Sequence, residues 1–271
     1  MKLTVLLENL VYQSKLQSEH GVSFWIQDDD GVELLFDSGQ TDLFAQNASI
    51  LQTDLSKIDY FVLSHGHYDH SGGLPEFLKL NKKAKLYIGK DAFLPKYHGD
   101  EYIGVPKLEN IAHRVLSITE PINLSKQITL FPHIDIKNYS DTHFGKLMVC
   151  KNNQIEQDSF EEEQFLAIVK GTRLTIVSGC SHRGISNMLA TALSHFSGSS
   201  IGDISIVGGL HLIDSSEEQI DRFIECLKKF PISKISTCHC TGVEAYHQIK
   251  NKMGTMGIEV SYAKTGDEFE L

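Results

Sequence analysis

The chain has 271 residues, 41% of them apolar and 22% charged, which suffices for a large folded domain and excludes an intrinsically disordered chain. Its formal net charge of −10, with no basic cluster beyond Lys82 and Lys83, argues against a nucleic-acid partner. No stretch approaches the ~20 apolar residues of a membrane span, and the N-terminal apolar run has no small-residue cleavage site, so we expect a cytoplasmic protein without membrane contact.

Strands and helices connected by short turns are predicted for the first third of the chain. We expect strands at residues 2–9, 22–27, 32–36, 58–64 and 85–88, and helices at 41–55 and 74–80. An acidic run ending in Gly31 is a hairpin signal between the second and third strands. Residues 91–145 are punctuated by four prolines, and we expect an insertion there that lines a pocket.

Strands and helices alternate in the last third. We expect strands at residues 165–170, 174–178, 203–208, 234–238 and 257–263, and helices at 185–196, 217–230 and 242–253. The run from Glu161 to Glu163 is expected to be a solvated turn. No linker divides the chain, so the elements predict one domain over residues 1–271, an α/β sandwich in which two mixed sheets are flanked by helices.

Five cysteines form an odd set without the spacing of a disulfide framework, so we expect reduced thiols. Cys238 and Cys240 flank a histidine and resemble part of a zinc knuckle. Residues at i and i+2 of a strand point to the same face, however, and no second cysteine pair completes a structural zinc site.

The segment from Ser64 to Gly73 carries the strongest functional signal and directly follows a predicted buried strand. Within six residues it contains His65, His67, Asp69 and His70. Imidazole nitrogens and a carboxylate oxygen suit zinc, iron or manganese. Gly66 allows a tight turn, so the four side chains can point into one small volume. This density of ligand-type residues predicts a metal site rather than a solvated polar loop.

The same segment resembles the HxHxDH signature of the metallo-β-lactamase superfamily, whose fold is an αββα sandwich. Phe36-Asp37-Ser38-Gly39 is similar to the early FDxG motif of that family. Three later segments, at residues 177–184, 207–212 and 237–242, resemble the branch of dihydropterin ribofuranosyl-aminobenzene phosphate synthases. The resemblance implies one or two divalent metal ions, with zinc expected first and manganese or iron as alternatives.

It also implies a role for each matching residue. His65 and His67 would hold a first metal together with a third histidine. Asp69 and His70 would hold a second metal together with His239. Asp37 would orient a ligand histidine through a hydrogen bond.

Cys180 stands where much of the superfamily has a bridging aspartate. A thiolate at this position could bridge or ligate the metals. We favour His182, two residues later, as the missing third histidine, with His143 as the alternative. Without a bridging carboxylate, the second metal would bind more weakly.

Three further residues are candidates for substrate contacts. His211 would contact a substrate phosphate or donate a proton to the leaving group, as a histidine on the equivalent strand does in phosphodiesterase members; the alternative is a core histidine. Arg183 opens a predicted helix, where a guanidinium and a helix N-terminus would bind an anion, unless it is a surface arginine. His20 would approach the pocket. The remaining histidines, such as His98, have no motif context.

We therefore expect a metal-dependent hydrolase acting on a small phosphorylated or otherwise anionic metabolite, or the related synthase reaction. A bound metal would lower the pKa of a water from about 15.7 toward about 7. Asp69 would orient that nucleophile, while Arg183 and His211 would neutralise developing charge. Two other classes stay open. One is a redox enzyme of dioxygenase or diiron type, although the diiron type usually has glutamate where this chain has His67. The other is a metal-binding protein without turnover.

Overall fold

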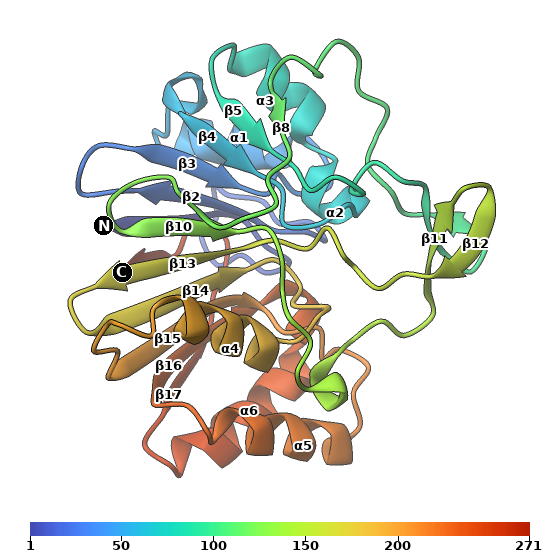
Figure 1. Cartoon of the computed structure of the whole chain (residues 1–271). Coiled ribbons are helices and arrows are strands. Elements are labelled where there is room, and N and C mark those ends of the chain that lie inside the picture. Colours follow the sequence, from blue (N-terminus) through green and yellow to red (C-terminus); the bar gives the residue numbers. More distant parts are fainter.

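Two seven-stranded sheets lie face to face in the computed structural model, which describes residues 1–271 (Figure 1). The first has the order β18-β1-β2-β3-β4-β5-β8. Its strands are β1 (Lys2–Leu7), β2 (Ser23–Gln27), β3 (Glu33–Phe36), β4 (Tyr60–Val62), β5 (Lys85–Tyr87), β8 (Val115–Leu116) and β18 (Glu268–Glu270). Pairs from β18 to β3 are antiparallel and pairs from β3 to β8 are parallel, so the sheet is mixed.

The second sheet is mixed in the same way, with parallel pairs from β14 to β17, and has the order β17-β16-β15-β14-β13-β10-β9. Its strands are β9 (Ile122–Asn123), β10 (Ile128–Phe131), β13 (Phe165–Lys170), β14 (Arg173–Ser178), β15 (Asp203–Gly209), β16 (Ile232–Cys238) and β17 (Glu259–Tyr262). Val5 and Phe24 of the first sheet share one buried cluster with Leu166 and Val177 of the second. Burial of this apolar surface between the sheets holds the two layers together.

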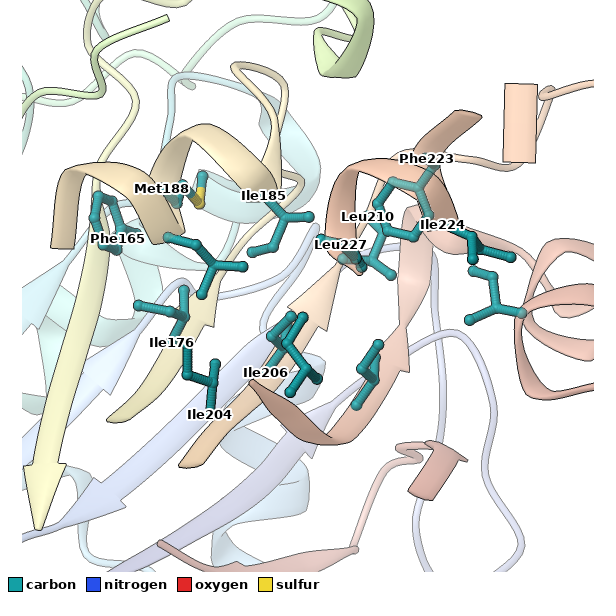
Figure 2. Close-up of a cluster of buried hydrophobic side chains, with 14 of the residues drawn as sticks. Phe165, Ile176, Ile185, Met188, Ile204, Ile206, Leu210, Phe223, Ile224 and Leu227 are labelled. Atoms are coloured by element: carbon teal, nitrogen blue, oxygen red, sulfur yellow. The ribbon is translucent and has the colours of Figure 1, made fainter. Parts of the chain in front are cut away.

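Helices cover the outer face of each sheet, which confirms the predicted sandwich. On the first sheet lie α1 (Leu43–Ile50) and α3 (Leu74–Leu80), whose Phe44 and Phe77 share a cluster with Phe61 of β4. On the second lie α4 (Ile185–His195), α5 (Glu217–Leu227) and α6 (Val243–Gly254). Figure 2 shows Ile185 and Met188 of α4 against the sheet. No helix is long and apolar enough to cross a membrane.

A separate four-stranded sheet of order β12-β11-β6-β7 lies beside the short helix α2 (Tyr68–Ser71) (Figure 1). Its strands are β6 (Lys96–His98), β7 (Glu101–Tyr102), β11 (Leu147–Lys151) and β12 (Gln154–Gln157). The stretch at 91–145, where we expect a pocket-lining insertion, supplies strands to all three sheets. Strands of two to four residues are too short to show a hydrophobic period.

Candidate metal centre

The candidate centre lies where strands of both main sheets end. The loops after β3, β4, β14, β15 and β16 carry, in order, Asp37, His65, Cys180, His211 and His239. Parallel neighbouring strands end at the same edge, which brings these loops together. Asp37 (φ 60°), His211 (φ 47°) and His239 (φ 50°) have left-handed backbone. Such conformations are uncommon for non-glycine residues and cluster at functional sites.

Three histidines, His65, His67 and His182, form the first donor set. Their ligand nitrogens lie within 4.8 Å of one another, and His65 Nε2 is 3.1 Å from His67 Nδ1. All three residues are buried. The Nε2 atoms of His67 and His182 have no hydrogen-bond partner. Buried polar atoms normally have one, so these nitrogens mark a position for a ligand.

Neighbouring groups fix the orientation of these rings. Ser64 Oγ lies 2.9 Å from His65 Nδ1, and the carbonyl oxygen of His143 lies 3.0 Å from His182 Nδ1. The ring of Phe160 stacks on that of His182, with centroids 3.8 Å apart. The imidazole of His143 belongs to no donor group, so His143 acts through its backbone. The structure thus brings His182, and not the alternative His143, to the other two histidines.

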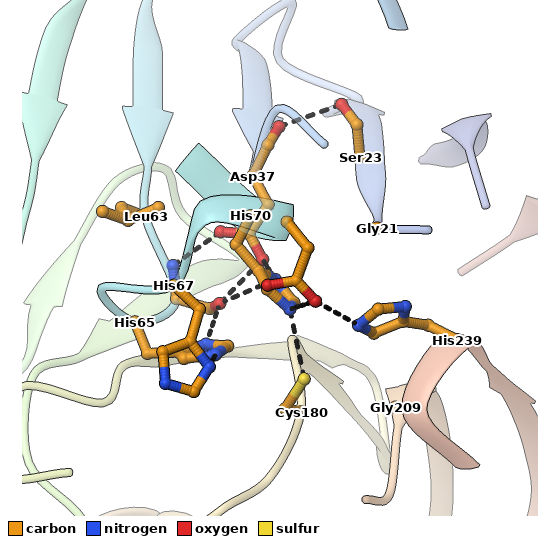
Figure 3. A network of polar contacts seen from close by, with 12 residues as sticks. Gly21, Ser23, Asp37, Leu63, His65, His67, His70, Cys180, Gly209 and His239 are labelled. Carbon is orange, nitrogen blue, oxygen red and sulfur yellow. Dashed lines mark hydrogen bonds and ion pairs between the residues drawn. The ribbon is translucent and has the colours of Figure 1, made fainter. Parts of the chain in front are cut away.

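Asp69, His70 and His239 are the second donor set that the family resemblance implies, and the structure places His70 and His239 on either side of the Asp69 carboxylate. The tighter groups of donor atoms are Asp69 and His239 with His20, and His70 with His65 and Cys180. Asp69 Oδ2 lies 3.2 Å from His239 Nε2 and 3.9 Å from His70 Nε2. The half-exposed His20 reaches the same carboxylate oxygen, with its Nε2 at 3.2 Å. Cys180 Sγ lies 3.1 Å from His70 Nε2 (Figure 3). A carboxylate, three imidazoles and a thiol are therefore neighbours in this part of the centre.

The Asp37 carboxylate connects the two sets (Figure 3). Its Oδ2 accepts hydrogen bonds from His70 Nδ1 and Ser64 Oγ, each at 2.7 Å, and its Oδ1 accepts one from the backbone N–H of Ser64 at 2.7 Å. Ser64 Oγ also contacts His65, so one carboxylate orients a histidine of each set. Hydrogen bonds of this kind fix the tautomer that presents the other ring nitrogen to a metal.

Protonation differs between the sets. Burial lowers the pKa of all three first-set histidines well below its usual value, so their rings are neutral and able to coordinate. Burial also opposes protonation of His70, but the Asp37 and Asp69 carboxylates outweigh it and raise the His70 pKa to about 9. In the metal-free chain, the second set therefore contains a protonated histidine at neutral pH.

Two buried glutamates hold the backbone of the ligand loops. Glu163 accepts the backbone N–H groups of His182 and Arg183, each at 2.7 Å. Glu8, at the end of β1, accepts the N–H of His239 at 2.5 Å. Burial raises the pKa of both carboxyls to about 7. The sequence indicated no site role for either residue: Glu8 lies inside the strand predicted at residues 2–9, and Glu163 lies in the run expected to be a solvated turn.

The acidic run is not a solvated turn, contrary to the expectation. Glu161 is exposed, but Glu162 and Glu163 are buried. Glu162 pairs with the buried Lys96 at 2.7 Å, and Asp158 pairs with the same ammonium group. Lys96 is 62 residues from Asp158 in the chain, so no local pattern could have indicated this network.

The donors of both sets fit divalent metal ions. His211 Nδ1 joins the buried nitrogens that lack a hydrogen-bond partner, and His239 Nε2 faces the Asp69 carboxylate at 3.2 Å. Imidazole, carboxylate and thiolate together suit zinc, while imidazole and carboxylate alone also suit iron and manganese. His65, His67 and His182 would hold one ion, and Asp69, His70 and His239 would hold another.

An open pocket of about 520 Å³ leads to both sets. It is lined by His20, His67, Asp69, His98, Gly145, Lys146, Leu147, Cys180, His182, His211, Ile213, Asp214, His239 and Cys240. The sequence did not single out His98 or Lys146, because they come from the small sheet and the loop before β11. It noted Cys240 only as part of a zinc-knuckle-like fragment without a second cysteine pair.

Arg183 does not line this pocket, which corrects the expected anion contact. Its Nε donates to the carbonyl oxygen of Ile134 at 3.0 Å and its Nη1 to that of Ser159 at 2.6 Å. The side chain is nearly buried, and these carbonyls occupy its donors. Arg183 therefore braces neighbouring loops.

Comparisons with known proteins agree with this architecture. Residues 18–191 match the model of the metallo-β-lactamase superfamily. The chain is 32% identical over 266 residues to the 7,8-dihydropterin-6-methyl-4-(β-D-ribofuranosyl)-aminobenzene-5'-phosphate synthase of Methanocaldococcus jannaschii, covering 90% of this chain and 89% of that relative. It is 31% identical to an uncharacterised protein of the same organism, covering 90% of this chain and 91% of the relative.

Solved structures show the same fold. The crystal structure of Tm1679, described as a metal-dependent hydrolase of the β-lactamase superfamily, has a TM-score of 0.83 at 28% identity and covers 100% of this chain and 99% of its own. The short form of human tRNase Z shares the fold at a TM-score of 0.52 and 12% identity, with 100% and 99% covered. By the match of its sequence and the arrangement of its layers, the chain belongs to the metallo-β-lactamase superfamily.

Proposed function

We propose that this chain is a metal-dependent hydrolase of a small phosphorylated or otherwise anionic metabolite, such as a phosphoester or cyclic phosphate. The observation that carries the proposal is the adjacency of the two donor sets, which share the segment from His65 to His70 and open into one pocket. Two neighbouring divalent ions can stabilise the attacking and leaving oxygens of a displacement at phosphorus and lower the pKa of a coordinated water.

Asp69 would be the catalytic carboxylate. Burial opposes its ionisation, but the nearby His70 and hydrogen bonds from His20 and His239 hold the pKa of Asp69 well below its usual value. An ionised carboxylate lining the pocket accepts a hydrogen bond from a nucleophilic water and thereby orients it.

The pocket lining also supplies positive charge for an anion. Lys146 is exposed and lines the pocket, and His20 lines it beside Asp69. A hydrogen bond to Asp69 raises the pKa of His20, which favours its protonated form. In a chain of net charge −10, cationic groups at the pocket favour entry of an anion there rather than elsewhere on the surface.

The test is hydrolysis of bis(p-nitrophenyl) phosphate by protein reconstituted separately with zinc, manganese and iron. We expect turnover with at least one metal, its loss in His67→Ala, and its retention in His133→Ala, a matched histidine at an exposed position. Absence of turnover in protein that carries stoichiometric metal would overturn the phosphodiester version. Oxygen uptake would instead favour a redox enzyme.

The 32% identity to the Methanocaldococcus jannaschii relative over 90% of the chain supports a second candidate, the synthase reaction for which that protein is named. The compound in that name joins a dihydropterin to a ribofuranosyl-aminobenzene that carries a 5'-phosphate. The pocket would then bind the phosphate of one reactant. In that reaction the aminobenzene nitrogen would displace a leaving group from the 6-methyl carbon of the dihydropterin and lose a proton. Mass spectrometry of the joined product distinguishes this candidate from hydrolysis.

A further inference from the structure

Two thiols and an imidazole gather beside the two donor sets, on three neighbouring strands of the second sheet. Cys180 follows β14, His211 follows β15 and Cys240 follows β16. Their ligand atoms, two sulfurs and one ring nitrogen, lie within 4.8 Å of one another. All three residues line the pocket that leads to the metal centre. We propose that Cys180, His211 and Cys240 form a third metal site, here called the sulfur site, that binds a soft ion of the zinc type.

The backbone around the sulfur site is shaped to bring the sulfurs together. A Cβ added at Gly209 would lie 2.5 Å from Cys240 Sγ, so only glycine leaves room for the thiol. The backbone N–H of His211 donates to Cys240 Sγ at 3.2 Å, and His211 holds a left-handed backbone conformation, φ 47°. Conformations of this kind persist only where the surroundings enforce them.

Hydrogen bonds fix the loops that carry His211 and Cys240 relative to each other. The N–H of Leu210 donates to Thr241 Oγ1 at 3.0 Å, and the N–H of Ile213 donates to the carbonyl oxygen of Cys240 at 3.1 Å. The donors therefore sit on two braced turns rather than on free loop ends. A preorganised site loses less conformational entropy when an ion binds.

The donor chemistry selects the ion. Cys180 is 2% exposed and Cys240 4% exposed, and His211 Nδ1 is buried without a hydrogen-bond partner. Two thiolates and one imidazole are the protein ligands of catalytic zinc sites that keep a fourth position open, here toward the pocket. Soft sulfur ligands disfavour manganese and magnesium. A metal-bound His211 cannot donate a proton from the same nitrogen, so this assignment replaces the proton-donor role expected from the sequence.

Cadmium is a suitable probe because sulfur-to-cadmium charge transfer absorbs in the ultraviolet, whereas histidine and carboxylate ligands give no such band. Chelated protein, reduced with a phosphine, is titrated with cadmium. We expect a band with the intensity of two thiolates. Cys240→Ser and Cys180→Ser should each reduce it by about half, since each removes one of two equivalent sulfur ligands. Cys150→Ser, a partly exposed cysteine on β11, should leave it unchanged.

An unchanged band in Cys240→Ser would overturn the proposal, because Cys240 would then contribute no sulfur ligand. Absence of a band in the wild-type chain would overturn it as well. Cadmium NMR of the wild-type chain gives the same answer without a variant: a resonance typical of two sulfur ligands supports the site, and resonances typical of one or no sulfur contradict it. None of these measurements uses turnover, so their outcome is independent of whether the protein is a hydrolase.

Discussion

The two donor sets share one loop but differ in chemistry. The first combines three buried, neutral imidazoles, and the Nε2 atoms of two of them have no hydrogen-bond partner. The second includes the Asp69 carboxylate and a protonated His70, and it has the partly exposed His20 and the Cys180 thiol as neighbours. The first set is therefore ready for a metal at neutral pH, whereas the second must first release a proton. The two metal positions are thus unequal before any ion binds.

Their supports differ as well. Phe160 and the loop of Glu163 hold the first set from the side of the small sheet, with Lys96 behind Phe160. The second set is held from the first main sheet, where Glu8 and Asn9 bind the backbone and Nδ1 of His239. Changes in either support should therefore affect one set more than the other.

Removal of one ligand from each set gives the largest expected effect. His182→Ala should lose the first metal and His239→Ala the second, each with a larger loss of turnover than the roughly 10–100-fold typical of partners that only orient a ligand. Elemental analysis after gel filtration counts the metals. His143→Ala is the control, since only its backbone contacts His182, and it should keep full metal content. Wild-type metal content in His182→Ala would contradict the first donor set.

Lys96→Met should give the next largest effect. The change leaves Asp158 and Glu162 buried without their cation, which costs about 3–5 kcal/mol of unfolding free energy. Lys96 Nζ lies 5.1 Å from the ring of Phe160, so the first set should lose more metal affinity than the second. Denaturant unfolding and competitive chelation measure the two effects.

The matched control for that change is Lys126→Met, which removes an exposed lysine paired with Asp30 at 3.2 Å. Exposed pairs contribute about 0–1 kcal/mol, so stability should hardly change. Equal loss of affinity at both sets in Lys96→Met would show that Phe160 does not transmit the change to the first set alone.

The sequence predicted the parts of the centre that are local in the chain. The donors from His65 to His70 lie within one turn, and strands and helices after residue 165 have enough length to show a period. The two-sheet sandwich followed from that alternation together with the family resemblance. The short strands β6 to β9 carried no such signal, because two or three residues cannot show one.

The remaining parts depend on contacts between distant segments. Glu8 and His239 are 231 residues apart, and they meet only because β1 and β16 end at the same edge of the sandwich. Cys240 becomes a candidate ligand only in the folded chain, where its sulfur lies close to that of Cys180. The absence of a side chain at Gly209 leaves the room for it. Arg183 matched the sequence signal of an anion site, but backbone carbonyls from other loops occupy its guanidinium.

The smallest expected effect is a difference between the two donor sets in how metal affinity depends on pH. Because the His70 pKa is raised from 6.5 to about 9, the metal-free chain holds a proton there that a metal must displace. Affinity of the second set should therefore rise by up to about tenfold per pH unit as the pH increases toward about 9, and then level off. The first-set histidines have pKa values well below 6.5, so its affinity should stay nearly constant over this range.

Competitive chelation between about pH 7 and 9 measures both slopes in one protein. Asp37→Asn sharpens the comparison, because it removes the nearest of the two carboxylates that raise the His70 pKa. The variant should bind the second metal more weakly at high pH but with a shallower pH dependence. Equal slopes of affinity against pH for the two sets in the wild-type chain would mean that His70 is already neutral. The Asp69 carboxylate alone would then distinguish the chemistry of the second metal position from that of the first.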